Sequence, residues 1–291
     1  MTVFIVSSKT DIASITIKKC LLENSSWNEI DIFLKNPVYQ HTNFTDVYLI
    51  TMNDSKIHHE NIDKEIIADL HITPKQIIFI SRHTSKMATP SLTVHPIGNY
   101  GEASFGGRPK TLVPSSPQLM TTLLRLIYKN MKKTDLKYQV CFEVTHHGPY
   151  LETPTLFVEV GSTKHEWKQT KPAKIIANSV IELLNTSRYE EDFQQKVPIL
   201  VGFGGGHYAP RFTDVVLEKN AAFGHMIPSY QITEGNVTLD TFQKALQATP
   251  NANGIYMHKK ALKKSQVTEY KQLLHENGIN VLSSKELPNL V

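Results

Sequence analysis

The chain has 291 residues, of which 40% are hydrophobic and 20% charged, and its formal net charge is +4. These values are typical of a globular protein and exclude intrinsic disorder, while the small positive charge does not by itself indicate a nucleic-acid partner. No apolar run reaches the roughly 18 residues of a membrane helix, and the first residues lack a secretory signal, so we expect a cytoplasmic protein with no membrane partner.

Short β-rich runs alternate along the chain with longer amphipathic runs. The predicted strands are 3–8, 45–52, 76–81, 91–95, 138–144, 155–160, 198–203 and 254–258. The clearest predicted helices are 117–133, 172–185, 239–249 and 265–277. In the first of these helices, Ser116 is a candidate N-cap ahead of Pro117.

This alternation predicts one α/β domain over residues 1–291, with a largely parallel sheet covered by helices on both faces. Strands 91–95 and 155–160 follow their predecessors too closely for a helical crossover, so the sheet is expected to be mixed. A long functional loop is expected near 99–117.

The two cysteines, Cys20 and Cys141, lie far apart in sequence and predict neither a disulfide framework nor a thiolate metal site. We expect both to be buried as small hydrophobic residues. Lysines gather in segments 129–137, 164–174 and 258–264. Such clusters fit a phosphate backbone, although solvated helix faces are the more common explanation for any one of them.

Five histidines stand at the ends of predicted strands. Ligands in open α/β sheets bind beyond the carboxyl ends of the strands, so these side chains are expected to converge. Histidine is the commonest metal ligand and a good proton carrier near neutral pH, and a hydrolytic zinc site needs about three protein ligands plus a position for water. The alternative is a set of histidines that only hydrogen-bond loop backbones. The five are His83, His95, His146, His147 and His207.

Glu143 precedes the histidine pair and is a candidate ligand, orienting group or acceptor for a substrate ammonium. If its strand continues, Glu143 shares a face with Thr145 and His147, while His146 points to the other side.

Two glycine-rich loops are candidate binding elements. Gly204, Gly205 and Gly206 follow an apolar strand and precede a helix-like segment, so their amides could hold a phosphate or an oxyanion, although neither the P-loop nor the dinucleotide pattern is present. Arg211 could pair with phosphate or carboxylate, or simply pack along its stem. In the second loop, 98–107, the aromatic side chains could stack on a base, although aromatic residues more often anchor a loop.

Four motifs occur together and in order: Ser-Arg-His at 81–83, Leu-Thr-Val-His at 92–95 with Gly98 and Asn99, 143–149, and 202–208. In this combination the chain resembles D-aminoacyl-tRNA deacylases of the archaeal and plant type, from about residue 3 to its end. The resemblance implies a zinc-dependent hydrolase with a phosphorylase/hydrolase-like α/β fold. It also implies that the enzyme cleaves the ester between a D-amino acid and the 3′-terminal ribose of tRNA, as cytoplasmic proofreading.

The resemblance leaves the roles of the site residues to be inferred. We expect a zinc ion held by His83, His95, His147 and His207, and catalysis by His146, Glu143 and Asn99. Substrate binding is expected from Gly204, Gly205, Gly206, Arg211 and Lys86. No obligatory protein partner is inferred, and a monomer is expected. Two alternatives remain open: a zinc-dependent peptidase or amidohydrolase on small substrates, and a metal-free protein similar to peptidyl-tRNA hydrolase.

Overall fold

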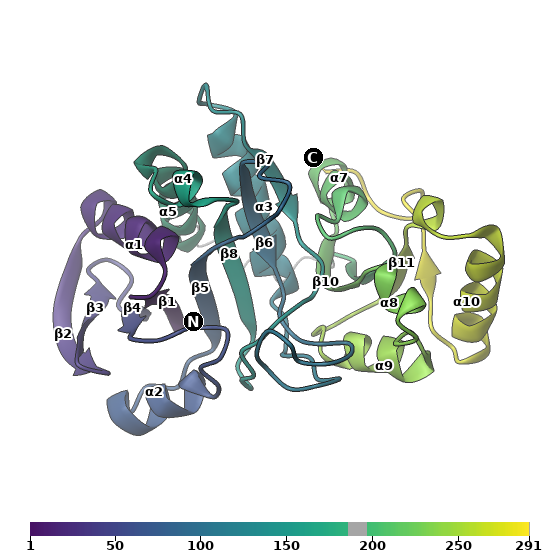
Figure 1. Cartoon of the computed structure of the whole chain (residues 1–291), viewed down its shortest axis with the longest axis horizontal. Helices are drawn as coiled ribbons and strands as arrows, with labels where there is room; N and C mark the ends of the chain where they lie inside the picture. Colours follow the sequence, from purple (N-terminus) through teal and green to yellow (C-terminus); the bar gives the residue numbers. More distant parts are fainter. Residues whose placement is uncertain (186–196, 291) are drawn as a thin grey trace.

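The computed structural model describes residues 1–185 and 197–290. Within these residues the strands form an eight-stranded and a four-stranded sheet, which lie side by side in Figure 1. The larger sheet has the order β2-β3-β4-β1-β5-β8-β6-β7. Its strands are β1 (Val3–Ser8), β2 (Trp27–Phe33), β3 (Asn36–His41), β4 (Val47–Met52), β5 (Gln76–Arg82), β6 (Ser91–His95), β7 (Gln139–Phe142) and β8 (Thr155–Gly161).

The larger sheet is mixed, as predicted. Strand β1 is parallel to β4 and β5, and β5 is parallel to β8, whereas β6 is antiparallel to β8. Helices cover both faces, which is also as predicted. The helices α1 (Ile12–Asn24), α3 (Pro117–Met131) and α5 (Thr170–Asn185) pack together over one face, and α2 (Ile62–Leu70) packs on the other.

Successive residues of a strand point to opposite faces of the sheet, so the side chains of β1 alternate between the two hydrophobic cores. Val3 and Ile5 join the core under α1, α3 and α5, whereas Phe4 and Val6 join the core under α2. Both cysteines are free and buried, as expected. Among the described residues there is no helix of the length and apolar character needed to span a membrane.

The smaller sheet was not predicted as a separate unit. It has the order β10-β9-β11-β12 with every pair parallel, and helix α3 of the larger unit packs against β10. Its strands are β9 (Ile199–Phe203), β10 (Ala222–Ile227), β11 (Gly254–Met257) and β12 (Val281–Leu282). The other helices of the described residues are α4 (Lys164–Trp167), α7 (Pro210–Glu218), α8 (Tyr230–Thr233), α9 (Leu239–Gln247), η1 (Lys259–Ala261) and α10 (Lys264–Glu276).

Helix α3 begins where it was predicted to begin, but not with the predicted cap. Ser116 occupies the N-cap position without a side-chain capping hydrogen bond. Its hydroxyl donates instead to the side-chain oxygen of Gln76, at the start of β5. The chain between β6 and α3, residues 96–116, forms a long loop between the two sheets.

Candidate active site

Five histidines and two glutamates meet on the face of the larger sheet that carries α2. Phe157 of β8 stacks on Phe79 in the core under α2, and Glu159, two residues further along β8, points to the same face. His83 and His95 lie next to Glu159, and four of the histidines, all except the fully buried His95, line a cleft of about 410 Å³ together with Glu159. The seven side chains are His83, His95, Glu143, His146, His147, Glu159 and His207.

The histidines converge as expected, but not because parallel strands share one edge. Since β6 runs antiparallel to β8, its carboxyl end lies away from the carboxyl end of β5. Strand β6 stops at His95, opposite Phe157 in the middle of β8, and β7 stops beside it at Phe142. His83 reaches the same region from the other direction, because it directly follows β5.

Glu143 links three of the histidines. It is fully buried, and its Oε2 lies 2.8 Å from Nε2 of His207 and 3.5 Å from Nε2 of His146. Its Oε1 lies 3.1 Å from Nδ1 of His83. Burial alone would raise the pKa of Glu143, but hydrogen bonds from His207 and His83 hold this pKa well below its usual range. Glu143 is therefore a carboxylate near neutral pH.

The alternation considered for Glu143 does not apply, because the strand on which it depends does not continue that far. Strand β7 ends at Phe142, so Glu143 lies outside the strand and its side chain does not follow the strand alternation. It faces His146, which was expected to point to the other side.

Glu159 is the second carboxylate, and the sequence analysis did not identify it. It is 3% exposed, and its Oε2 lies 3.5 Å from Nδ1 of His83 and 3.8 Å from Nε2 of His95. Burial lowers the pKa of His83, but hydrogen bonds with Glu143 and Glu159 outweigh this effect and raise that pKa to about 11. The available signal was an acidic residue inside the otherwise apolar strand Thr-Leu-Phe-Val-Glu-Val.

The other three histidines share one hydrogen-bonding pattern. Their Nδ1 atoms lie next to backbone carbonyl oxygens: Pro96 O at 3.1 Å from His95, Val144 O at 2.8 Å from His146 and Gly148 O at 2.5 Å from His147. A carbonyl oxygen only accepts a hydrogen bond, so each Nδ1 carries the proton and each Nε2 of a neutral ring is left with a lone pair.

Two of these rings are neutral near pH 7. Burial, together with the neighbouring His95, lowers the pKa of His147 to about 4 and the pKa of His146 well below its usual range. The lone pairs of these rings are therefore available to a metal ion or a proton.

Three groups of side chains are close enough to hold a metal ion among the described residues, with their ligand atoms within 4.8 Å of one another. The members are His95, His146 and His147 in one group, His83, Glu143 and His207 in another, and His95, Glu143 and Glu159 in the third. The ligand set expected from the sequence is divided between the first two groups, and His146 joins the first. Within the described part of the chain, His95 Nε2 is buried without a hydrogen-bond partner. Such an orphaned atom fits a bound cation or water.

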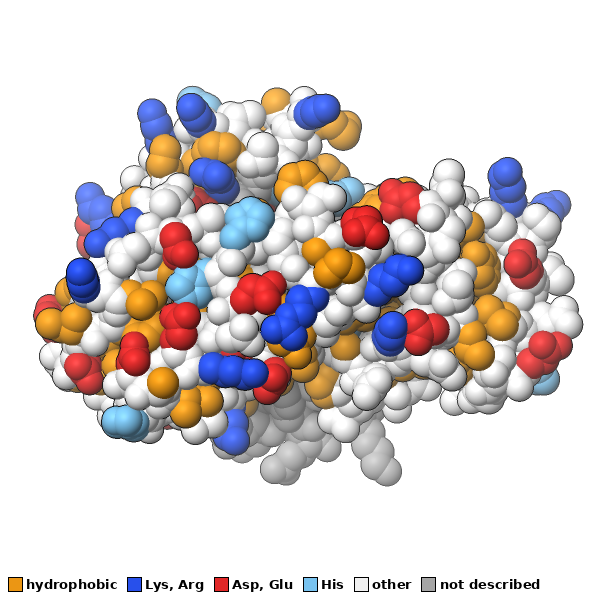
Figure 2. All heavy atoms as spheres, turned by 60° about the horizontal axis from the view of Figure 1, so that its bottom comes forward, with side chains coloured by type: hydrophobic (Ala, Val, Ile, Leu, Met, Phe, Trp, Pro, Cys, Tyr) orange, Lys and Arg blue, Asp and Glu red, His pale blue; other side chains and the backbone are white. Residues whose placement is uncertain are grey.

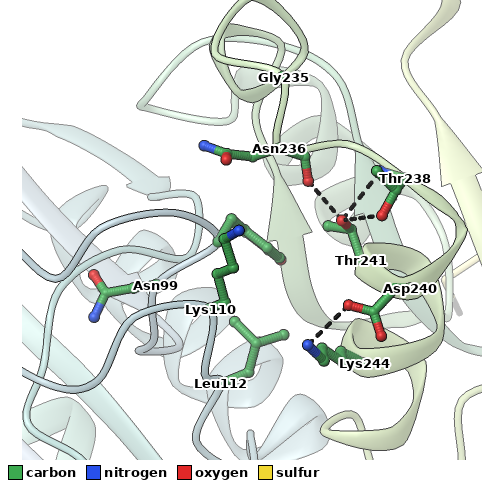
Figure 3. A pocket seen from close by; sticks show the side chains of 10 residues that line it. Asn99, Lys110, Leu112, Gly235, Asn236, Thr238, Asp240, Thr241 and Lys244 are labelled. Atoms are coloured by element: carbon green, nitrogen blue, oxygen red, sulfur yellow. Dashed lines mark hydrogen bonds and ion pairs between the residues drawn. The ribbon is translucent and has the colours of Figure 1, made fainter.

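Asn99, expected to be catalytic, has its hydrogen bonds in the long loop. Its Nδ2 donates to Gly106 O at 2.9 Å, and the residue borders a second, smaller pocket of about 100 Å³ together with Lys110 and Lys244. Figure 3 shows this pocket on the α9 side of the loop. The structure thus places Asn99 as a loop support, outside the group of seven side chains.

The glycine loop after β9 is only partly open. Gly204 N donates to Ile227 O at 2.8 Å, and Gly205 N donates to Ser229 Oγ at 2.7 Å. Beside Gly206 an added Cβ would meet no atom within 4 Å. Two of the three amides expected to bind substrate are therefore already paired within the protein.

The two expected basic contacts lie outside the cleft lining. Arg211 donates from Nε to Tyr256 Oη at 3.0 Å and from its terminal nitrogen to Ser284 Oγ at 2.7 Å, so it packs on the smaller sheet. Lys86 is exposed in the loop that follows His83.

The cleft has a further buried ion pair, between Lys56 and Asp11, that the sequence analysis missed. Asp11 also caps helix α1 through Ser14 N at 3.0 Å and accepts from Arg82 N at 2.9 Å. Asp11 lies in the connection between β1 and α1, Lys56 lies in the connection between β4 and α2, and Arg82 ends β5, so these contacts hold three segments together. Asp is a common N-cap residue, which was the signal for the cap, but the sequence contained no signal for its partner.

Comparison with known proteins identifies relatives along nearly the whole chain. A family model described as D-aminoacyl-tRNA deacylase matches residues 70–282. A protein of Thermococcus onnurineus named D-aminoacyl-tRNA deacylase is 36% identical over 281 residues, which cover 96% of this chain and 98% of that protein. One of the same name from Pyrococcus horikoshii is 40% identical over 228 residues, covering 78% of this chain and 80% of that protein. A crystal structure of a conserved protein of unknown function matches with a TM-score of 0.87 and 29% identity, covering 100% of this chain and 99% of that one.

Proposed function

The chain belongs to the D-aminoacyl-tRNA deacylase family, and on this premise we propose that it hydrolyses the ester bond between a D-amino acid and the 3′-terminal ribose of tRNA. The products are free tRNA and the D-amino acid, so the reaction is chiral proofreading and belongs in the cytoplasm, where D-aminoacyl-tRNA would have to be removed. The observation that carries the proposal is the cluster of five histidines and two buried carboxylates, of which four histidines and Glu159 line one cleft. The small-substrate peptidase and the metal-free hydrolase are not favoured by the family match.

We propose that zinc is held by His95, His146 and His147. Metal-binding histidines usually donate their second ring nitrogen to a carbonyl or carboxylate, which is the pattern of these three side chains. The orphaned Nε2 of His95 supports the same set. When bound there, zinc would supply Lewis-acid stabilisation of the carbonyl oxygen and a nucleophilic water at neutral pH. This assignment moves His146 from the catalytic to the metal-binding residues.

His207 and Glu143 are the proposed proton carriers. His207 is partly exposed to the cleft, and its Nε2 lies 2.8 Å from the buried carboxylate of Glu143. Glu143 therefore fixes the ring so that its other nitrogen faces outward, where it accepts a proton from water and later returns it to the departing ribose oxygen. The charge of Glu143 stabilises the imidazolium that forms in between.

His83 balances charge in this scheme. Two carboxylates buried side by side repel each other unless a cation separates them. The protonated ring of His83 lies between Glu143 and Glu159, and its Nε2 lies 3.1 Å from the hydroxyl of Tyr208. His83 thus keeps Glu143 ionised and in position.

Two of the lysine clusters support a tRNA partner. Lys133 at the end of α3 and Lys171 and Lys174 of α5 line one groove of about 530 Å³, beside Asp135. By contrast, on the described part of the face at the bottom of Figure 1, Lys and Arg side chains are interspersed with acidic ones (Figure 2). We therefore expect backbone phosphates to contact the α3–α5 side, and binding to weaken steeply with salt.

The test is deacylation of D-Tyr-tRNA by the purified protein, with L-Tyr-tRNA as the matched substrate. We expect D-Tyr-tRNA to be hydrolysed in preference to L-Tyr-tRNA, activity to be lost after chelation, and activity to return with zinc but not with magnesium. Absence of hydrolysis in zinc-replete buffer would contradict the proposed reaction. Full activity in chelated, metal-free protein would contradict the zinc assignment alone.

A further inference from the structure

Phe105 is an exposed aromatic ring at the edge of the catalytic cleft. Its side chain is 69% exposed, and it lines the same cleft as His146 and His147. The other aromatic residue of this loop, Tyr100, is buried, and its hydroxyl lies 3.5 Å from Thr145 Oγ1. Tyr100 therefore anchors the loop and Phe105 does not. An aromatic ring that a protein leaves exposed in a cleft, without an anchoring role, suggests a binding surface.

The backbone that follows the Phe105 side chain is fixed. Its carbonyl accepts from Gly148 N at 3.1 Å, and the next carbonyl, of Gly106, accepts from Asn99 Nδ2 at 2.9 Å. Gly106 has a φ of +77° and packs so tightly that an added Cβ would lie 1.7 Å from Ile57 O. The loop thus presents the ring without a large ordering cost on binding, which favours affinity.

The flat, exposed ring fits a flat, apolar group of the substrate. Stacking of a base on an aromatic side chain contributes substantially to the binding of single-stranded nucleic acid, and it requires no specific hydrogen bonds. In an aminoacyl-tRNA the scissile ester is attached to the ribose of the terminal adenosine, so the adenine is the base that must lie next to the catalytic residues. A cleft of about 410 Å³ has room for a group of this size.

We propose that Phe105 is the stacking platform for the terminal adenine of tRNA. This inference rests on the proposed function. It assigns recognition of the constant part of the substrate to the 98–107 loop and leaves recognition of the amino acid to other residues of the cleft. Since the ring contacts the base and not the reacting atoms, Phe105 is a binding residue whose loss changes KM and not kcat.

The test compares Phe105→Ala and Phe105→Trp with the unchanged protein on two substrates, D-Tyr-tRNA and D-tyrosine ethyl ester, which lacks the adenosine. Phe105→Ala is expected to raise KM for D-Tyr-tRNA about 5- to 150-fold with kcat nearly unchanged. Phe105→Trp, which keeps an aromatic face, is expected to have a KM close to that of the unchanged protein. Turnover of the ethyl ester is expected to be the same in all three proteins. Met87→Ala is the matched control, because Met87 is 76% exposed and lies outside the residues that line the cleft.

Two results would overturn the inference. One is an unchanged KM for D-Tyr-tRNA in Phe105→Ala. The other is an equal loss of activity on D-tyrosine ethyl ester in Phe105→Ala, which would mean that the ring contacts the amino acid and not the adenine. If the unchanged protein fails to hydrolyse D-Tyr-tRNA at all, the proposed function is contradicted.

Phe105 can be tested separately by the binding of a tRNA whose terminal base is the fluorescent analogue 2-aminopurine. Quenching of its fluorescence by the unchanged protein but not by Phe105→Ala would support stacking on the ring. Equal quenching by both proteins would contradict it.

Discussion

Replacing Glu159 by Gln tests how the two buried carboxylates and His83 depend on one another. The pKa of His83 is raised from 6.5 to about 11, because its bonds with Glu143 and Glu159 outweigh its burial. The substitution keeps the shape of the side chain and removes one of the two negative charges. The two carboxylates supply the net rise and also offset the lowering by burial, so removing one of them should remove at least half of the net rise and leave the pKa of His83 at or below about 9 in Glu159→Gln.

The sign of the effect on stability follows from the raised pKa. A group whose pKa is raised in the folded state stabilises the folded protein, and for His83 this contribution is fully present below its unfolded pKa of 6.5. As the pH rises above 6.5, the contribution falls by about 1.4 kcal/mol per pH unit until the folded pKa is reached. In the unchanged protein the loss of this contribution continues to about pH 11, whereas in Glu159→Gln it ends at or below about pH 9. The difference in free energy of unfolding between the two proteins should therefore shrink by about 2 kcal/mol between pH 9 and pH 11.

The assay is urea unfolding of chelator-treated protein at pH 7, 9 and 11. Lysines and tyrosines also titrate in this range, but they are common to both proteins and cancel in the difference. Glu276→Gln is the matched control, because Glu276 is exposed on α10 and accepts a hydrogen bond from Gln272. A stability difference for Glu159→Gln that stays constant from pH 9 to pH 11 would refute the assigned charge arrangement.

Three further predictions concern the ligands of the metal site, the protonation of His147 and the packing of the loop at Gly106. His95→Ala and His146→Ala are expected to lose bound zinc, measured by elemental analysis, while exposed His275→Ala retains it; zinc retained in all three would contradict the assigned ligands. Because the pKa of His147 is lowered to about 4, its ring in zinc-free protein should stay neutral down to about pH 5, as followed by the NMR shifts of its ring protons, and a titration midpoint near 6.5, as for an ordinary histidine, would contradict the neutral ring. Gly106→Ala should cost more thermal stability and more activity than Gly235→Ala, since both glycines have positive φ but only Gly106 is packed against Ile57 O; equal losses would show that the packing is unimportant.

The strands of the larger sheet could be predicted where their composition is apolar. Strand β1 is buried along its whole length and was predicted with its observed ends. Strand β2 was not predicted, because it is an edge strand whose side chains, such as Glu29 and Asp31, are mostly exposed. Helix α1 was missed because its first turns are rich in β-branched residues, and packing against α5 and β5 outweighs that local preference.

The sequence indicated which histidines belong to the candidate site, but not which side chains contact one another there. Strand-end positions identified the five histidines, because this property can be read from local sequence. Glu159 and the pair of Asp11 with Lys56 depend on contacts between distant segments, which periodicity does not contain. The contacts of Arg211 with Tyr256 and Ser284 could not be foreseen for the same reason, since the smaller sheet that binds its side chain was not predicted.

The central claim is that this cluster of histidines and carboxylates hydrolyses the D-aminoacyl ester. The most direct measurement is kcat/KM for D-Tyr-tRNA with His207→Ala, compared with the unchanged protein and with His275→Ala. Loss of a general base is expected to lower kcat/KM by about 100- to 10,000-fold, with His275→Ala unchanged. Hydrolysis by His207→Ala at the rate of the unchanged protein would contradict the account.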